Sequence, residues 1–166
     1  MLQGHIPAST TRTTAPFLEY ARRLDREIER AGAQTVFFMT WPQGRLEWAD
    51  LDDFVEAHRR ISAELDAPVA PVGMAFEMVR NERPDLLLIG DDDIHATWEG
   101  AYLAAATVYA TLYGRSPEGL SYTFGVDADD AAFLQRIAWQ AVTEWRDGLE
   151  PAEQDTGESD GDGAAS

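Results

Sequence analysis

A run of three aspartates followed by a histidine is the part of the sequence whose residue types could most directly do chemistry. The run is Asp91-Asp92-Asp93-Ile94-His95, in which Asp92 stands three residues ahead of His95. A carboxylate at that spacing can fold back across a tight turn and accept a hydrogen bond from Nδ1–H. That bond fixes the imidazole tautomer and leaves Nε2 free to act as a general base. The spacing also suits a solvated acidic loop with a surface histidine, which is the more common arrangement.

Metal-dependent hydrolysis is a second chemistry that the acidic run could support. Asp91, Asp93, Glu99 and His95 carry donor atoms that a hard divalent cation accepts. They have no regular ligand spacing, so we predict neither a metal ion nor another cofactor for this protein.

Composition excludes several classes of function. The 166 residues include 30 acidic and 13 basic side chains, which gives a net charge of -17. Because so negative a protein repels the phosphate groups of nucleic acids, we expect no nucleic-acid partner. The absence of cysteine excludes disulfides, thiolate metal sites and cysteine nucleophiles. The longest apolar stretch, 101–113, is too short to span a bilayer, and the first ten residues do not resemble an export signal. We therefore expect a cytoplasmic protein without a membrane partner.

Five helical segments are expected to position the aspartate–histidine loop. The first is amphipathic, and its apolar residues at helical spacing are Phe17, Ala21, Leu24, Ile28 and Ala31. Asp50 can cap the second helix, in which His58 falls on the apolar side and is expected to be a core histidine. The remaining helices are predicted over 74–83, 99–113 and 128–145.

Apolar runs between these helices predict the strands. The runs 34–41 and 67–73 do not alternate with polar residues, which is typical of strands buried on both faces, and 1–4 could be the end of a third strand. Helices alternating with such strands predict an α/β fold with a parallel sheet, and the aspartate–histidine loop should lie at the carboxyl ends of its strands. Residues 1–149 would form this domain, and 150–166 an acidic disordered tail.

The segment 92–105 resembles the last conserved block of the SGNH, or GDSL-type, hydrolases. In that block an Asp-x-x-His pair is followed by a Gly-x-Tyr-Leu-Ala-Ala helix, and the same residues occur here in the same order. The similarity extends in the family's order to 36–41, 67–73 and 112–120. It implies a three-layer α/β/α fold of the flavodoxin-like kind.

The resemblance also implies a function. Members of this family cleave esters or related acyl bonds through Ser, His and Asp, without a cofactor. By this resemblance His95 is the general base, Asp92 is its orienting carboxylate, and a small-molecule ester is the substrate.

The sequence departs from the family at several points. The family's nucleophile lies in a Gly-Asp-Ser-type turn after the first strand, and no such turn is present. The Gly-x-Asn-Asp block is also absent, and Ala96 replaces the proline that often follows the family's histidine. This pattern predicts a chain that begins near the family's third strand and lacks the nucleophile. The sheet edge left open would then favour self-association.

Four further residues are weaker site candidates. Gln3 and Gly4 resemble a strand end of one subgroup of the family and could donate to an oxyanion, although a polar loop residue and a turn glycine would look the same. Trp41 and Trp98 could form the wall of an acyl pocket, and packing in the core is the alternative for Trp41.

Three functional hypotheses follow from the sequence. The first is an SGNH-type ester hydrolase represented by its C-terminal part, which would be inactive as given because the serine is missing. The second is a non-catalytic SGNH-like protein that binds a partner or a small ligand. The third is a metal-dependent hydrolase that uses the acidic loop.

Overall fold

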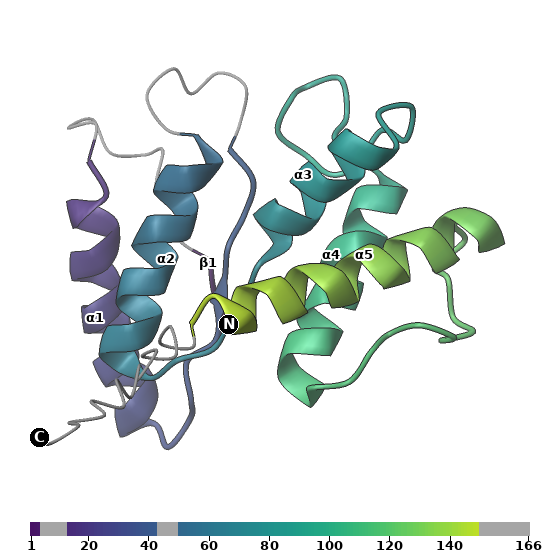
Figure 1. Ribbon diagram of the computed structural model, residues 1–166. Helices are drawn as coiled ribbons and strands as arrows, with labels where there is room; N and C mark the ends of the chain where they lie inside the picture. The colour runs from purple at the N-terminus through teal and green to yellow at the C-terminus, as the bar shows by residue number, and fades with distance from the viewer. Residues whose placement is uncertain (4–12, 43–49, 150–166) are drawn as a thin grey trace, which may run out of the picture.

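The computed structural model describes residues 1–3, 13–42 and 50–149, which combine helices with a parallel sheet (Figure 1). In chain order the elements are β1 (Leu2–Gln3), α1 (Ala15–Arg30), β2 (Phe37–Phe38), α2 (Leu51–Leu65), β3 (Val69–Ala70), α3 (Val72–Glu82), α4 (Trp98–Tyr113) and α5 (Ala128–Asp147). The strand order is β1-β2-β3, and both neighbouring pairs are parallel. The predicted α/β class with a parallel sheet is confirmed.

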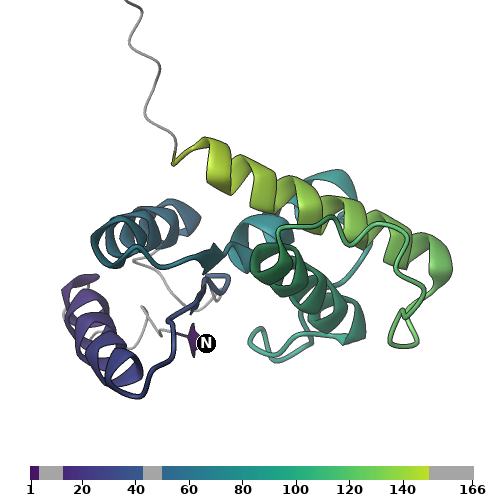
Figure 2. The ribbon, with the colours of Figure 1, turned by 90° about the horizontal axis from the view of Figure 1, so that it is seen from below.

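The strands are short, and both of their faces are covered. Phe37 of β2 pairs with Leu2 of β1 and with Val69 of β3. Since the side chains of neighbouring strand residues point to opposite faces of the sheet, the side chains of Phe37 and Phe38 pack on opposite sides of it. Figure 2 shows α1 and α2 on one side of the strands and α3, α4 and α5 on the other. The apolar runs without alternation thus belong to strands buried on both faces, as predicted.

Two hydrophobic cores lie on the two sides of the sheet. One core joins α1 and α2 to Phe37, Met39 and Val69, and it also receives Trp145 from the last turn of α5. The other core joins α3, α4 and the rest of α5 to Ala70, with Phe38 packed against it. The ring of Trp145 lies beneath the guanidinium of Arg59, whose central carbon is 4.7 Å from the ring centroid. Trp145 therefore connects α5 to the core on the far side of the sheet.

Most helix ends follow local capping chemistry. Asp50 accepts a hydrogen bond from the backbone N–H of Asp53, and the Asp53 side chain accepts one from the N–H of Asp50, which completes a capping box at the start of α2. Asp127 caps α5 by accepting from the N–H of Asp129. Helix α4 ends at Gly114, whose φ of 62° places it in the left-handed region that glycine adopts without strain.

Three local predictions differ from the structure. The strand expected over 34–41 is limited to Phe37–Phe38. The strand expected over 67–73 ends at Ala70, because Pro71 is the N-cap of α3 and Val72 is its first residue. On α1 the buried stripe is Leu18, Ala21 and Asp25, and not the stripe containing Leu24, which is 47% exposed. Both stripes have helical spacing and share Ala21, so periodicity alone could not distinguish them.

Within the described ranges, no helix combines the length and the apolar character needed to cross a membrane. Among the described residues, strand β1 pairs only with β2, so no described strand lies at its other edge. Association of two copies through that edge stays a prediction.

His58 is a core histidine, as predicted. Its side chain is fully buried, its Nδ1 lies 2.7 Å from the carbonyl oxygen of Phe54, and its ring lies 4.8 Å from that of Phe17. Its Nε2 has no hydrogen-bond partner among the described residues. Burial lowers the pKa of His58 to about 4, against an ordinary value of 6.5.

The buried His58 predicts a loss of stability in acid. As the pH falls below 6.5, the unfolded chain takes up a proton at this side chain, whereas the folded chain resists doing so until about pH 4. The free energy of unfolding should therefore fall between these two values by about 3 kcal/mol, beyond the contributions of other groups. Urea unfolding of the wild type and His58→Met across this range measures the difference. A stability that depends on pH in the same way in the wild type and in His58→Met would contradict the assignment.

Candidate active site

The aspartate–histidine run lies in a tight loop between α3 and α4. The two arms of this loop meet at an antiparallel bridge between Ile89 and Ala96. The backbone N–H of Gly90 donates to the carbonyl of His95 at 2.8 Å, and the N–H of Thr97 donates to the carbonyl of Leu88 at 3.0 Å. His95 is thus held on the returning arm of a small hydrogen-bonded hairpin.

The start of α4 anchors this hairpin to the fold. The Thr97 hydroxyl accepts from the N–H of Gly100 at 3.1 Å and donates to the carbonyl of Leu87 at 2.8 Å. Gly100 lies so close to the other arm that a Cβ at this position would be 2.1 Å from the carbonyl oxygen of Leu88. The absence of a side chain at Gly100 is therefore what allows α4 to pack against the loop.

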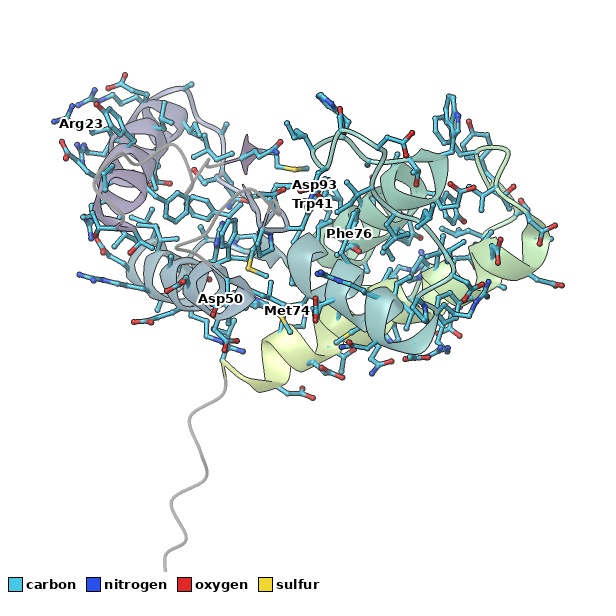
Figure 3. All side chains as sticks on the ribbon, turned by 90° about the horizontal axis from the view of Figure 1, so that it is seen from above. Arg23, Trp41, Asp50, Met74, Phe76 and Asp93 are labelled. Carbon is cyan, nitrogen blue, oxygen red and sulfur yellow. The ribbon has the colours of Figure 1, made fainter. Side chains whose placement is uncertain are left out.

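The loop lies at the carboxyl ends of the strands, where the sequence predicted it. In Figure 1 the connection between α3 and α4 is at the upper edge of the molecule, the end toward which β2 and β3 run. Figure 3, seen from above, shows Asp93 of this loop over the part of the molecule that contains Trp41 and Phe76. Open α/β sheets commonly carry their sites at this end.

Asp92 and His95 form the predicted pair. Asp92 Oδ2 lies 2.5 Å from His95 Nδ1, and Oδ1 accepts hydrogen bonds from the backbone N–H groups of Ile94 and His95 at 3.0 and 2.9 Å. Asp93 has a φ of 59°, which reverses the chain within the loop, and its own N–H donates to the carbonyl of Gly90 at 3.0 Å. Asp92, and neither of its aspartate neighbours, is the hydrogen-bond partner of the imidazole.

The hydrogen bonds keep Asp92 ionised. The pKa of the Asp92 carboxyl is held well below its usual range by these hydrogen bonds. The bond from the His95 side chain has the largest effect, and the two backbone N–H donors add to it. An ionised Asp92 accepts from Nδ1–H, so the neutral imidazole presents an unprotonated Nε2. The His95 side chain is 82% exposed, which leaves this nitrogen accessible to a reactant.

The candidate oxyanion donors and the serines of the chain are only partly described. Gln3 is an exposed residue at the carboxyl end of the edge strand β1, whereas Gly4 lies outside the described residues, and so does Ser9, a serine near the start of the chain. The hydroxyl of Ser62 is buried and donates to the carbonyl of Ala67 at 2.8 Å. Ser116 donates to Glu118 at 3.1 Å. Neither of these two serines has a hydrogen bond to His95.

The two candidate tryptophans have different surroundings. Trp41 is 9% exposed and stacks on Phe76, with ring centroids 4.2 Å apart and planes at 6°, so it is a core residue and not the wall of an open pocket. Trp98, the first residue of α4, is 67% exposed, and its ring centroid is 4.9 Å from that of Phe124. Of the two tryptophans, only Trp98 has a side chain that is exposed to solvent.

The structure adds two aromatic residues that the sequence analysis missed. Tyr122 is 76% exposed and Phe124 is 43% exposed, and their ring centroids are 6.5 Å apart beside Trp98. Their loop is held by Tyr102, whose hydroxyl donates to the carbonyl of Tyr122, and by Gln135, which donates to the carbonyl of Leu120. Gly125 and the left-handed φ of Phe124 mark a turn, but nothing in the sequence indicates that the turn returns to α4.

No convergent metal site is present in the described parts of the chain. Among residues 1–3, 13–42 and 50–149, no three His, Asp or Glu side chains come close enough together to hold a metal ion. Asp91, Asp93, Glu99 and His95 are all within those ranges and do not form such a group. The metal-dependent hypothesis therefore has no support from the geometry of the loop.

Comparisons with known proteins identify no relative. No protein-family model, curated protein or solved structure matches this chain.

The contact at Gly100 predicts a large difference between two glycine substitutions in this region. Gly100→Ala should lower the free energy of unfolding by about 1–3 kcal/mol, because its Cβ would meet the backbone carbonyl of Leu88. In Gly90→Ala the nearest atom, the carbonyl oxygen of His95, would be 3.6 Å away, and the loss should stay below about 0.5 kcal/mol. Urea unfolding of both variants measures these values. Equal losses would show that the close approach of α4 does not constrain the loop.

Proposed function

We propose that Asp92 and His95 are the acid–base pair of an SGNH-type ester hydrolase with a three-layer α/β/α fold. The observation that carries this proposal is the contact between Asp92 Oδ2 and His95 Nδ1 at 2.5 Å. Its support comes from the position of the pair at the carboxyl ends of the strands and from the family resemblance of the segment that contains it.

The proposed chemistry is general acid–base catalysis of acyl transfer. Asp92 accepts from Nδ1–H and stabilises the imidazolium that forms when Nε2 takes a proton from the attacking hydroxyl. The same nitrogen then returns the proton to the leaving alcohol. An exposed position suits this role, because both the hydroxyl and the ester must reach Nε2.

A serine hydroxyl is the remaining requirement of this mechanism. The chain contains no Gly-Asp-Ser turn, and the described Ser62 and Ser116 are engaged with other groups. We propose that the nucleophile is a serine other than these two. Gln3 and Gly4 remain candidates for the oxyanion donors, with a small-molecule ester as the substrate.

A non-catalytic SGNH-like binding protein is the alternative, and the absence of the nucleophile turn favours it. The pair would then be a structural remnant that stabilises the loop through the hydrogen bonds that Asp92 accepts from the backbone N–H groups of Ile94 and His95. Activity measurements distinguish these two proposals.

The first prediction from the proposed pair concerns the tautomer of His95. At a pH where the imidazole is neutral, the proton should reside on Nδ1 in the wild type, because Asp92 accepts from that atom. In Asp92→Asn the amide can donate to Nδ1 instead, so the proton should move to Nε2. Long-range ¹H–¹⁵N correlation spectra assign the protonated nitrogen. Asp93→Asn is the matched control and should leave the tautomer unchanged. A wild-type histidine with its proton on Nε2 would contradict the proposed base.

The second prediction concerns catalysis. The chain as given should hydrolyse p-nitrophenyl acetate and butyrate no faster than His95→Ala, because the sequence has no Gly-Asp-Ser turn and, among the described residues, Asp92 and not a serine is bonded to the His95 ring. A version extended upstream by a strand ending in a Gly-Asp-Ser turn should gain ester hydrolysis, and His95→Ala should reduce that activity by several orders of magnitude.

Two outcomes of these assays would change the proposal. If the extended version shows no turnover that depends on His95, the hydrolase proposal fails and the binding protein is favoured. If the chain as given hydrolyses ester in a way that depends on His95, and Ser9→Ala abolishes this activity, Ser9 is the nucleophile. An added Gly-Asp-Ser turn is then not required for hydrolysis.

A further inference from the structure

A small apolar cavity lies between α3 and the segment that leads from this helix to the His95 loop. Its volume is about 220 Å³. It is lined by Phe76 and Arg80 of α3, by Pro84, and by the apolar run 86–89. Sites for drug-sized ligands usually measure about 300–1,000 Å³, so this cavity suits a smaller molecule.

Contacts outside the cavity hold both of its walls in place. Phe76 is 2% exposed, and its ring stacks on that of Trp41 with centroids 4.2 Å apart; both residues are labelled in Figure 3. On the opposite wall, the carbonyl of Leu87 accepts from the Thr97 hydroxyl at 2.8 Å, and the carbonyl of Leu88 accepts from the Thr97 N–H at 3.0 Å. A ligand therefore meets a wall that is already formed, which lowers the entropic cost of binding.

The lining carries a single charge, and this charge is positive. Among the described residues that line the cavity, only Arg80 is charged, although the chain has 30 acidic and 13 basic residues. The Arg80 NH2 group donates to Glu77, but a guanidinium has five N–H donors, and this side chain is 63% exposed. Donors thus remain for an anionic ligand, and the aliphatic stem of Arg80 adds to the apolar lining.

The apolar and charged parts of the wall follow one another along α3. Phe76 and Arg80 are one helical turn apart, so their Cβ atoms are about 5–6 Å from each other. Phe76 is buried and Arg80 is exposed, which places the apolar end inside and the cation at the mouth. The cavity has room for roughly seven groups of the size of a water molecule, at about 30 Å³ each, and a methylene group is of similar size.

We propose that this cavity binds an unbranched aliphatic carboxylate of medium length, such as hexanoate or octanoate. The carboxylate pairs with Arg80, and the alkyl chain lies between Phe76 and the run 86–89. This inference is independent of the proposed hydrolase, because it uses neither Asp92 nor His95 and its test requires no turnover.

Titration of the ¹⁵N-labelled full chain with butyrate, hexanoate and octanoate tests the proposal. The affinity, measured from ¹H–¹⁵N correlation spectra, should rise about fourfold with each methylene group that enters the cavity. The amide signals that shift should be those of 86–89 and of the adjacent turn of α3, and not those of α1.

Two substitutions on α3 should change the affinity for octanoate in opposite directions. Arg80→Gln should weaken binding about three- to fivefold, because it removes an exposed ion pair with the ligand, and should leave the affinity for octan-1-ol unchanged. Glu77→Gln should strengthen the binding of octanoate, because it removes the carboxylate that competes for the Arg80 guanidinium.

Arg30 and Glu27 provide the matched controls, since they form an ion pair of the same i,i+3 spacing at exposed positions of α1. Arg30→Gln and Glu27→Gln change the net charge by the same amounts and should alter the affinity for octanoate by less than about twofold. Equal effects of Arg80→Gln and Arg30→Gln would show a response to net charge alone and overturn the proposal. An affinity that does not rise from butyrate to octanoate would also overturn it, because the alkyl chain would then lie outside the cavity.

Discussion

The parallel pairing of β2 between β1 and β3 is the constraint on which the rest of the structure depends. Parallel strands can be joined only by crossover connections, and here α1 and α2 serve as those connections and cover one face of the sheet. The other face of β2 and β3 carries Phe38 and Ala70, which also require a cover. Helices α3, α4 and α5 provide it, and the connection between α3 and α4 reaches the carboxyl end of the sheet as a result.

Features decided by residues close in sequence could be predicted from the sequence. The capping box of α2 joins Asp50 to Asp53, and the site joins Asp92 to His95, so in each case one turn of chain contains both partners. The buried face of α1 was different, because Leu18 and Leu24 both fit an apolar stripe. Contact with the sheet decides between them, and this contact involves residues that are far apart in the chain.

The rest of the candidate site depends on such long-range contacts. The contacts of Trp98 with Phe124, and of Phe124 with Tyr122, form only because the loop that carries Tyr122 and Phe124 returns to the start of α4. Asp25 is likewise buried beside Leu18 and Ala21 because of the face that α1 turns toward the sheet, and its polar side chain does not indicate this burial. A sequence pattern gives the periodicity of a helix, but the tertiary packing selects which side chains are withdrawn from water.

Trp145 makes the two cores parts of one cooperative system. It belongs to the helix that covers one face of the sheet, yet its ring is buried among residues of α1 and α2 on the other. Local opening of the last turn of α5 would withdraw Trp145 from the core that it shares with α1 and α2, so such an opening exposes a large buried ring to water. Amide protons at the end of this helix should therefore exchange with solvent more slowly than those of a helix end that carries no buried side chain.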